Sequence, residues 1–219
     1  MRFFEEGTVP AMVRIKICGV TRGEDAELLA ELGVDAIGLN FYPKSPRFVT
    51  LEQARSLLPH CGPFMSTVGV FVSNDPLVDH AEALSLGLRA WQTYSEKPVH
   101  IDGISSAHIP AYRVKTAEDL ERVRRDLAVV RPAAVLIDSY VPGELGGTGH
   151  VAPWHLLAEF DPGAPLILAG GLTPDNVAEA IRIVRPWGVD VASGVESAPG
   201  IKEEGRVRAF VEAVRATRL

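Results

Sequence analysis

The sequence has few cysteines, no long apolar run and no signal-peptide pattern. Only two of its 219 residues are cysteines, Cys18 and Cys61, too few for a disulfide framework, so we expect both to be reduced thiols. No apolar stretch reaches the ~18 residues that a membrane span needs. The first twelve residues carry Glu5 and Glu6 and lack the basic-then-apolar order of a secretory leader. These absences predict a cytoplasmic protein without a membrane partner.

An excess of positive charge is also missing, as is any metal-ligand spacing. The 22 lysines and arginines against 28 aspartates and glutamates give a formal net charge of −6, which argues against nucleic acid as a main partner. The six histidines, at positions 60, 80, 100, 108, 150 and 155, show no spacing that would place metal ligands on one helix face. The sequence therefore predicts no metal site.

What the sequence does have is a repeated alternation of strand-like and helix-like segments. Apolar runs, alternating or continuous, predict strands, and apolar stripes at helical spacing predict helices. The expected strands span residues 13–18, 35–41, 64–72, 88–92, 109–114, 133–138, 166–169 and 189–191. The expected helices span residues 24–32, 51–58, 78–86, 117–130, 154–160, 173–184 and 203–216. Residues 93–106 show no clean helical period, so a fourth helix there would be short or irregular.

Eight strand-then-helix units of about 25–30 residues each predict an α/β fold with a parallel sheet. Eight such units close into a TIM (β/α)8 barrel, which we expect over residues 13–219, behind an N-terminal extension of residues 1–12. The hydrophobic content of 47% is enough for one sizeable core. An open doubly wound sheet is the alternative, and the lack of a Gly-x-Gly-x-x-Gly after the first strand counts against it.

Functional residues of such barrels lie where the strands end, at their carboxyl edge. The first strand alternates, so Lys16 and Cys18 share one face. Gly19 then permits a sharp turn, and Thr21 is expected to cap the helix that follows. A cation such as Lys16 would raise the thiolate fraction of Cys18. The plainer interpretation of a free cysteine is a small buried hydrophobe, and we apply it to Cys61.

The ends of other strands and loops offer further polar candidates. Asp138 ends the sixth strand, and a carboxyl group there is either a capping group or a proton-transfer group. Strand six lies across a barrel from strand one, so Asp138 and Cys18 suit proton removal from one atom and delivery to another. Gln92 ends the fourth strand. Arg47 follows the second strand and can hold a carboxylate with two parallel hydrogen bonds, although alone it would be interpreted as a solvated loop arginine.

Glycines follow the seventh and eighth strands, where barrels often bind phosphate. Gly171, Ser193 and Gly194 can bring converging backbone N–H groups close to an anion. Thr173 and Pro174 are expected to start the helix after strand seven. One glycine pair alone is explained equally well by a tight turn, but glycines in both of the expected loops favour a phosphate site.

Together these residues resemble the phosphoribosylanthranilate isomerase family of tryptophan biosynthesis. The resemblance spans about residues 13–217, in the family's order. The matching segments are Lys16-Ile-Cys-Gly-Val-Thr21, Gly38-Leu-Asn-Phe-Tyr-Pro-Lys-Ser-Pro-Arg47, Val68-Gly-Val-Phe-Val72, Leu136-Ile-Asp138, Gly146-Gly-Thr-Gly149 with Trp154, Leu168-Ala-Gly-Gly-Leu172 and Val189-Asp-Val-Ala-Ser-Gly-Val-Glu196. The first and last segments are the most specific.

The resemblance implies an isomerase that works without cofactor or metal, as a monomer or homodimer. Its reaction is the Amadori rearrangement of N-(5-phosphoribosyl)anthranilate to 1-(2-carboxyphenylamino)-1-deoxyribulose 5-phosphate. The resemblance implies Cys18 as the general base at the sugar C2 and Asp138 as the general acid at the ring oxygen. The implied binding residues are Arg47 for the anthranilate carboxylate, Gln92 and Asp190 near the substrate, and Gly171, Ser193 and Gly194 for the phosphate. From the sequence alone, Asp190 is equally well explained as a strand-start residue.

The chain departs from the family pattern in two places. The family usually has Gln-Leu-His-Gly after strand four, where this chain has Gln92-Thr-Tyr-Ser95, and Pro110 stands where strand five usually carries a lysine. These changes leave room for a related barrel phosphosugar isomerase with a changed substrate, or for a degenerate barrel that binds a phosphorylated ligand without chemistry. Retention of Cys18 and Asp138 argues against the degenerate barrel. The cysteine also argues against a histidine-pathway isomerase, which usually relies on two aspartates.

Overall fold

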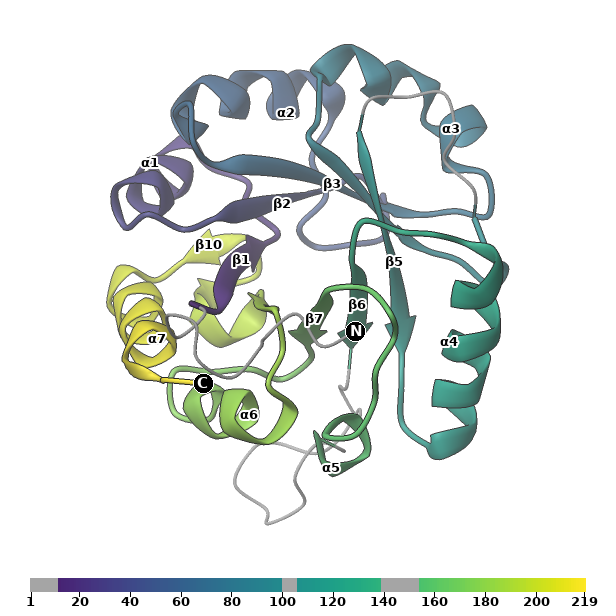
Figure 1. Ribbon diagram of the computed structural model, residues 1–219. Helices are drawn as coiled ribbons and strands as arrows, with labels where there is room; N and C mark the ends of the chain where they lie inside the picture. The colour runs from purple at the N-terminus through teal and green to yellow at the C-terminus, as the bar shows by residue number, and fades with distance from the viewer. Residues whose placement is uncertain (1–11, 100–105, 139–153) are drawn as a thin grey trace.

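The computed structural model describes residues 12–99, 106–138 and 154–219, and its strands form a closed parallel barrel (Figure 1). Each strand pairs with its neighbours in chain order, and β8 pairs with β1 to close the ring. The barrel strands are β1 (Arg14–Cys18), β2 (Ala36–Asn40), β3 (Ser66–Val72), β4 (Ala90–Tyr94), β5 (Ala107–Arg113), β6 (Val135–Asp138), β7 (Leu166–Ala169) and β8 (Gly188–Val191). The predicted barrel is confirmed. The predicted extension, apart from Met12, lies outside the described residues.

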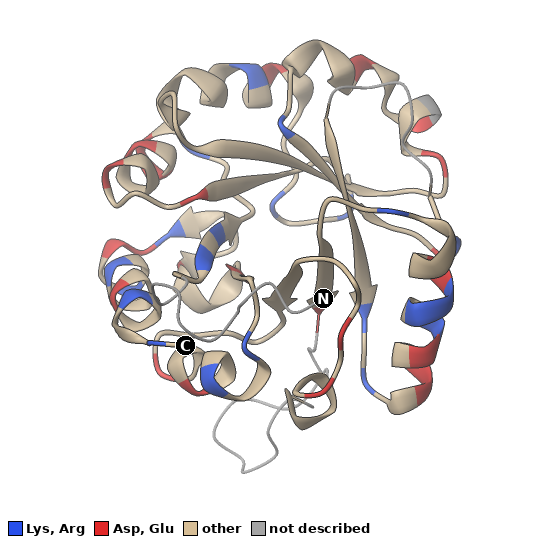
Figure 2. Ribbon diagram, in the orientation of Figure 1, with Lys and Arg blue, Asp and Glu red and all other residues tan. Residues whose placement is uncertain are grey.

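Helices surround the ring of strands (Figure 1). They are α1 (Gly23–Glu31), α2 (Leu51–Leu57), α3 (Pro76–Asp79), α4 (Ala117–Val129), α5 (Trp154–Leu157), α6 (Val177–Val184) and α7 (Glu204–Ala216), with the 3-10 helices η1 (Leu58–Cys61), η2 (Ala81–Leu86) and η3 (Ser193–Val195). The helices α4 and α7 carry both acidic and basic residues, whereas α1 carries acidic residues alone (Figure 2). None of the helices in the described ranges is long and apolar enough to cross a membrane.

Alternate residues of the strands fill two separate cores. The outer core lies between strands and helices, and it includes Ile15 and Ile17 of β1. The inner core fills the barrel with small and aliphatic side chains. Its buried members are Val68, Ala90, Ile109, Ala111, Ala134, Leu136, Ile167 and Ala169. Because successive side chains of a strand point to opposite faces, Lys16 and Cys18 project to the inner side, as the sequence predicts.

The predicted strand 64–72 and helix 78–86 are both shorter in the structure. Phe64 lies in the turn before β3 and is 97% exposed, so it belongs to neither core. The segment after β3 forms the single turn α3 and then η2 instead of one α-helix. Gly87 ends η2 in the left-handed conformation with φ 62°, which glycine adopts without strain.

Two predicted helix starts are wrong. The hydroxyl of Thr21 donates to the Gly200 carbonyl oxygen at 2.6 Å, so Thr21 does not cap α1. The helix after β7 begins at Val177 rather than at Thr173. The backbone N–H of Thr173 donates to Asn176 Oδ1 at 2.8 Å, and this local bond holds the preceding residues in a turn.

A short antiparallel hairpin after β8 was not predicted. It consists of β9 (Glu196–Ala198) and β10 (Ile201–Lys202), which are too short to show an alternating pattern. The structure also extends β4 to Tyr94, and residues 95–99 form no helix. Residues 100–105 of the predicted irregular stretch lie outside the described residues, as does the glycine-rich segment 143–149.

Candidate active site

Cys18 lies at the carboxyl end of β1, directly beside Gly38 of β2. A Cβ atom added to Gly38 would lie 2.7 Å from Cys18 Sγ and 3.0 Å from Lys16 Nζ. The glycine therefore leaves the space in which the thiol and the ammonium group meet. The predicted common face of Lys16 and Cys18 is confirmed.

Lys16 is held by Asp190 of the neighbouring strand β8. Lys16 Nζ donates to Asp190 Oδ1 at 2.9 Å, and the two side chains are only 6% and 7% exposed. Burial alone would lower the pKa of Lys16, but the charge of Asp190 and the nearby Cys18 more than offset it, so this pKa lies above its ordinary value. Asp190 thus holds Lys16 beside Cys18, and its place near the substrate stays a prediction.

The thiol of Cys18 is a weaker acid than an ordinary cysteine. Burial raises the pKa of Cys18 above its ordinary value of 9.0, and Asp190 raises it further. Lys16 and Lys202 lower it, but by less than burial raises it. Lys16 thus acts on Cys18 in the predicted direction, toward more thiolate, but burial outweighs it. Cys61 is 2% exposed and packs in the outer core, which confirms its structural interpretation.

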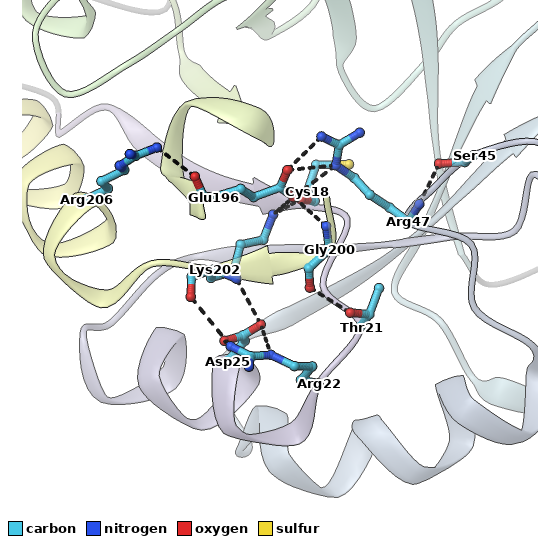
Figure 3. A network of polar contacts seen from close by, with 10 residues as sticks. All are labelled: Cys18, Thr21, Arg22, Asp25, Ser45, Arg47, Glu196, Gly200, Lys202 and Arg206. Carbon is cyan, nitrogen blue, oxygen red and sulfur yellow. Dashed lines mark hydrogen bonds and ion pairs between the residues drawn. The ribbon is translucent and has the colours of Figure 1, made fainter. Parts of the chain in front are cut away.

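Arg47, in the loop after β2, is bound to Glu196 of β9 (Figure 3). Its Nε lies 2.9 and 3.1 Å from the two carboxylate oxygens of Glu196, and its Nη2 lies 2.6 Å from Oε2. The two parallel hydrogen bonds expected of Arg47 are thus made within the protein, and Arg47 is not a solvated loop residue. Among the described residues no group accepts a hydrogen bond from Nη1, so one edge of the guanidinium stays available.

Lys202 of β10 also binds Glu196 and forms a group of three charges with Glu196 and Arg47. Its Nζ lies 2.7 Å from Glu196 Oε1 and donates to the carbonyl oxygen of Cys18 at 2.6 Å. Burial raises the pKa of Glu196, but hydrogen bonds from Arg47 and Lys202 outweigh burial and hold this pKa below its ordinary value. Sequence reasoning missed both residues. Glu196 closes the last family segment without an assigned role, and a lysine ahead of a surface helix carries no signal of its own.

Asp138, Gln92 and Tyr94 lie on other strands of the same barrel end. Asp138 ends β6, as predicted. Gln92 is 1% exposed, and its Oε1 has no hydrogen-bond partner in the part of the chain that the structure describes. Burial raises the pKa of Tyr94 well above its ordinary value, and Asp138, Asp190 and Cys18 raise it further. The phenol of Tyr94 is therefore within electrostatic reach of both predicted catalytic groups.

The loops after β7 and β8 contact one another at the predicted phosphate residues. A Cβ atom on Gly194 would lie 1.9 Å from the carbonyl oxygen of Leu172, so only glycine fits there. Gly171 has a φ of 64°, and its carbonyl oxygen accepts a hydrogen bond from Asn176 Nδ2 at 2.9 Å. The N–H groups of Ser193 and Gly194 begin η3, where a helix supplies no internal acceptor. The structure brings these loops together, and their phosphate role stays a prediction.

Residues 15–213 match the family model described as N-(5'-phosphoribosyl)anthranilate (PRA) isomerase. The chain belongs to this family. A relative of that name from Pseudomonas savastanoi pv. phaseolicola is 47% identical over 207 residues, which cover 94% of this chain and 98% of the relative. A Myxococcus xanthus relative of the same name is 46% identical over 209 residues, covering 94% of this chain and 98% of the relative.

Solved structures of PRA isomerases have the same fold. The Thermotoga maritima enzyme superposes with a TM-score of 0.82 at 38% identity, covering 93% of this chain and 98% of the other. A PRA isomerase in complex with reduced 1-(o-carboxyphenylamino)-1-deoxyribulose 5-phosphate gives a TM-score of 0.79 at 36% identity, with the same coverage. The resemblance found in the sequence motifs is confirmed by both kinds of comparison.

Proposed function

We propose that this chain converts N-(5'-phosphoribosyl)anthranilate to 1-(2-carboxyphenylamino)-1-deoxyribulose 5-phosphate by an Amadori rearrangement. The observation that carries the proposal is the placement of Cys18 and Asp138 at the carboxyl ends of β1 and β6 in one closed barrel. Membership of the PRA isomerase family supports the same reaction. The product analogue bound to a structural relative has the phosphate, the sugar and the carboxylate that this chemistry requires.

In the proposed mechanism Asp138 is the general acid and Cys18 is the general base. Asp138 protonates the ring oxygen as the furanose opens, and the bond between C1 and that oxygen breaks to leave an iminium group at C1. Cys18 then removes the proton from C2, and the electrons of the C–H bond neutralise the iminium nitrogen. The resulting enolamine becomes the ketone as C1 gains a proton and the C2 hydroxyl loses one, so that Cys18 gives up the proton it took and Asp138 regains the one it gave. A positioned acid or base of this kind contributes ~10²–10⁴-fold in rate.

Cys18 can take the C2 proton only as a thiolate, so the thiol must first lose its own proton to water. Its raised pKa makes that loss less favourable than for an ordinary cysteine. Lys16 lies beside the sulfur as a buried cation fixed by Asp190, so negative charge that forms on the sulfur meets an oriented ammonium group. Cys18 as a whole residue is only partly buried, at the carboxyl end of β1 where we place the substrate.

Substrate binding is assigned to three places around the barrel end. Gly171, Ser193 and Gly194 supply backbone N–H groups for the phosphate. Gln92 Oε1, buried and without a partner among the described residues, accepts a hydrogen bond from a sugar hydroxyl. Arg47 donates to the anthranilate carboxylate from Nη1, which makes no hydrogen bond to the described residues.

Steady-state assays that follow anthranilate fluorescence test this proposal. We expect turnover by the wild type and a loss of ~10²–10⁴-fold in kcat for both Cys18→Ala and Asp138→Asn. Cys61→Ala is the matched control, because it removes the other thiol, which is buried in the outer core. Absence of wild-type turnover, or full turnover by Cys18→Ala, would contradict the proposal.

Tyr94 supports keeping one second candidate, an isomerase of the same barrel type with a changed phosphosugar substrate. It replaces the family's usual histidine and lies within electrostatic reach of Asp138 and Cys18. Arg113 lies over its ring, 5.8 Å from the centroid, near the strand in which Pro110 replaces the usual lysine. A screen of phosphosugar amines with different aglycones decides between the candidates, since a substrate preferred over the anthranilate compound would favour the second. A degenerate, non-catalytic barrel predicts tight ligand binding without turnover in the same screen.

The partner and location predictions follow the family and the composition. We propose a phosphosugar as the only small-molecule partner, with no cofactor. A Thermotoga maritima structure is described as that of mutually generated monomers of a dimeric enzyme, and for this chain the alternatives of monomer and homodimer stay open predictions. The absence of nucleic-acid and membrane partners and the cytoplasmic location also stay predictions.

A further inference from the structure

Arg47, Glu196 and Lys202 form a buried group of three charges next to the strand end that carries Cys18 (Figure 3). The side chain of Glu196 is 4% exposed and that of Lys202 is 0% exposed. Arg47 is the outermost member, with 21% of its side chain exposed. The carboxylate of Glu196 lies between the two cations, because Oε1 contacts Lys202 Nζ and Oε2 contacts Arg47 Nη2. This group therefore presents one cation to solvent and hides the other.

The hairpin β9–β10 fixes this group to the first barrel strand. The backbone N–H of Lys202 donates to Asp25 Oδ2 at 3.2 Å, and its Nζ donates to the Cys18 carbonyl oxygen at 2.6 Å. The turn of the hairpin is held by the Thr21 hydroxyl on the Gly200 carbonyl oxygen. Lys202 is thus anchored at both ends and cannot swing away from Glu196 without breaking these contacts.

A charge count explains why a second cation is needed. Arg47 and Glu196 alone form a neutral pair, and a neutral pair offers little attraction to an incoming carboxylate. Lys202 adds one positive charge on the far side of Glu196, so the three residues together carry +1. A substrate with one carboxylate restores neutrality when it binds the free Nη1 edge of Arg47.

We propose that Lys202 balances Glu196 so that Glu196 can orient Arg47 without cancelling its attraction for the substrate carboxylate. Glu196 and Lys202 are then positioning residues that determine specificity for a carboxylate-bearing aglycone. This inference rests on the proposed function, because it takes Arg47 as the ligand of the anthranilate carboxylate. The alternative is that Lys202 only anchors the hairpin. The two roles predict different results. Loss of an anchor should weaken the binding of every ligand alike, whereas loss of the balancing charge should weaken only the binding of ligands that carry the carboxylate.

The test compares two reduced product analogues that differ only in the aglycone, one with 2-carboxyphenylamino and one with phenylamino. Their dissociation constants are measured by titration calorimetry at low ionic strength. We expect the wild type to prefer the carboxylate-bearing analogue, since charge-assisted hydrogen bonds contribute about tenfold or more. Lys202→Met should lower this preference by about tenfold while leaving the affinity for the phenylamino analogue within about twofold of wild type.

A double variant makes the test sharper. Glu196→Gln together with Lys202→Met removes both hidden charges, so the group again carries +1 through Arg47. We expect the double variant to recover part of the carboxylate preference that Lys202→Met loses. Recovery of this kind does not follow from an anchoring role, because the double variant has even fewer hairpin contacts. Thr21→Val, which removes a hairpin anchor without changing charge, should leave the preference ratio unchanged.

The outcomes separate this inference from the function it rests on. An unchanged preference ratio in Lys202→Met, or an equal fall of the ratio in Thr21→Val, overturns the charge-balance role while leaving the isomerase proposal intact. A double variant with a lower ratio than Lys202→Met also overturns it. A wild type that binds neither analogue, or binds both equally, instead overturns the proposed substrate. Thermal unfolding of each variant confirms that the compared proteins are folded.

Discussion

Two buried lysines lie on either side of Cys18, and their surroundings differ. Lys16 lies inside the barrel, where Asp190 accepts its hydrogen bond and no arginine in the described part of the chain shares that carboxylate. Lys202 lies on the hairpin outside the ring of strands and shares the carboxylate of Glu196 with an arginine. In the barrel, Asp190 therefore neutralises Lys16 alone. At the hairpin β9–β10, which we call the rim, Glu196 is shared by Lys202 and Arg47.

The pKa directions of the two lysines follow this difference. Burial lowers the pKa of both, but Asp190 and Cys18 outweigh burial at Lys16, so the pKa of Lys16 ends above its ordinary value. At Lys202 burial prevails, because Glu196 is shared and Arg47 repels, and the pKa of Lys202 ends below its ordinary value. The barrel lysine is thus a fixed cation beside the thiol, and the rim lysine keeps its charge through Glu196.

The largest expected difference between Lys16 and Lys202 is in how much each stabilises the folded protein. Lys16→Met leaves Asp190 buried without a cation, and loss of one partner of a buried ion pair costs about 3–5 kcal/mol. We expect the free energy of unfolding in urea at pH 7 to fall by about this amount. Lys202→Met should cost less, because Glu196 keeps its hydrogen bonds to Arg47.

The double variant Lys16→Met with Asp190→Asn serves as the control for that comparison. It removes the uncompensated charge, so it should recover a large part of the stability that Lys16→Met loses. If Lys202→Met proved as destabilising as Lys16→Met, the contrast between an exclusive and a shared carboxylate would be wrong.

The position of Lys16 beside Cys18 could be predicted from the sequence, because it depends on the alternation of side chains along a strand. Alternation in β1 places Lys16 and Cys18 on the inner face whatever the loops do, and the closing of eight parallel strands brings β8 next to β1. The sequence therefore predicts the position of the thiol and the nearby lysine. It does not predict the direction of the thiol's pKa, because burial depends on how tightly the barrel end is packed around Gly38.

The contacts between Glu196, Lys202 and Arg47 could not be predicted, because they depend on the hairpin β9–β10, which has no signal in the sequence. Glu196 and Lys202 are separated by Gly200 in a tight turn, and the two strands are too short for an alternating pattern. Their contacts reach residues almost the whole chain length away, such as Thr21. The start of α6 was also predicted wrongly, for a different reason. Thr173 is a typical helix-capping residue, but its backbone N–H donates to Asn176 Oδ1, and this local hydrogen bond holds it in the turn before the helix.

A smaller effect that separates the two lysines should appear in the reactivity of Cys18. Its raised pKa means that little thiolate exists at pH 7, so the rate of alkylation should rise about tenfold per pH unit up to that pKa. Lys16→Met should move this rise to higher pH by more than Lys202→Met does, because Lys16 lowers the pKa of Cys18 more strongly. All variants carry Cys61→Ala, so that only one thiol reacts. A wild-type rate that levels off below pH 9.0, the ordinary pKa of a cysteine, would contradict the assigned direction.

The smallest effect concerns Glu196 and acid stability. Because the folded-state pKa of Glu196 lies below its ordinary value of 4.5, its charge stabilises the fold fully above that value. This stabilisation is lost as the pH falls through the lower, folded-state pKa. Glu196→Gln removes the titrating group, so the wild-type advantage in free energy of unfolding should be largest near neutral pH and shrink below pH 4.5. An advantage for wild-type Glu196 that grows toward acid would mean that its two cations do not stabilise the carboxylate, and the rim would then hold no balanced charge for Arg47 to use.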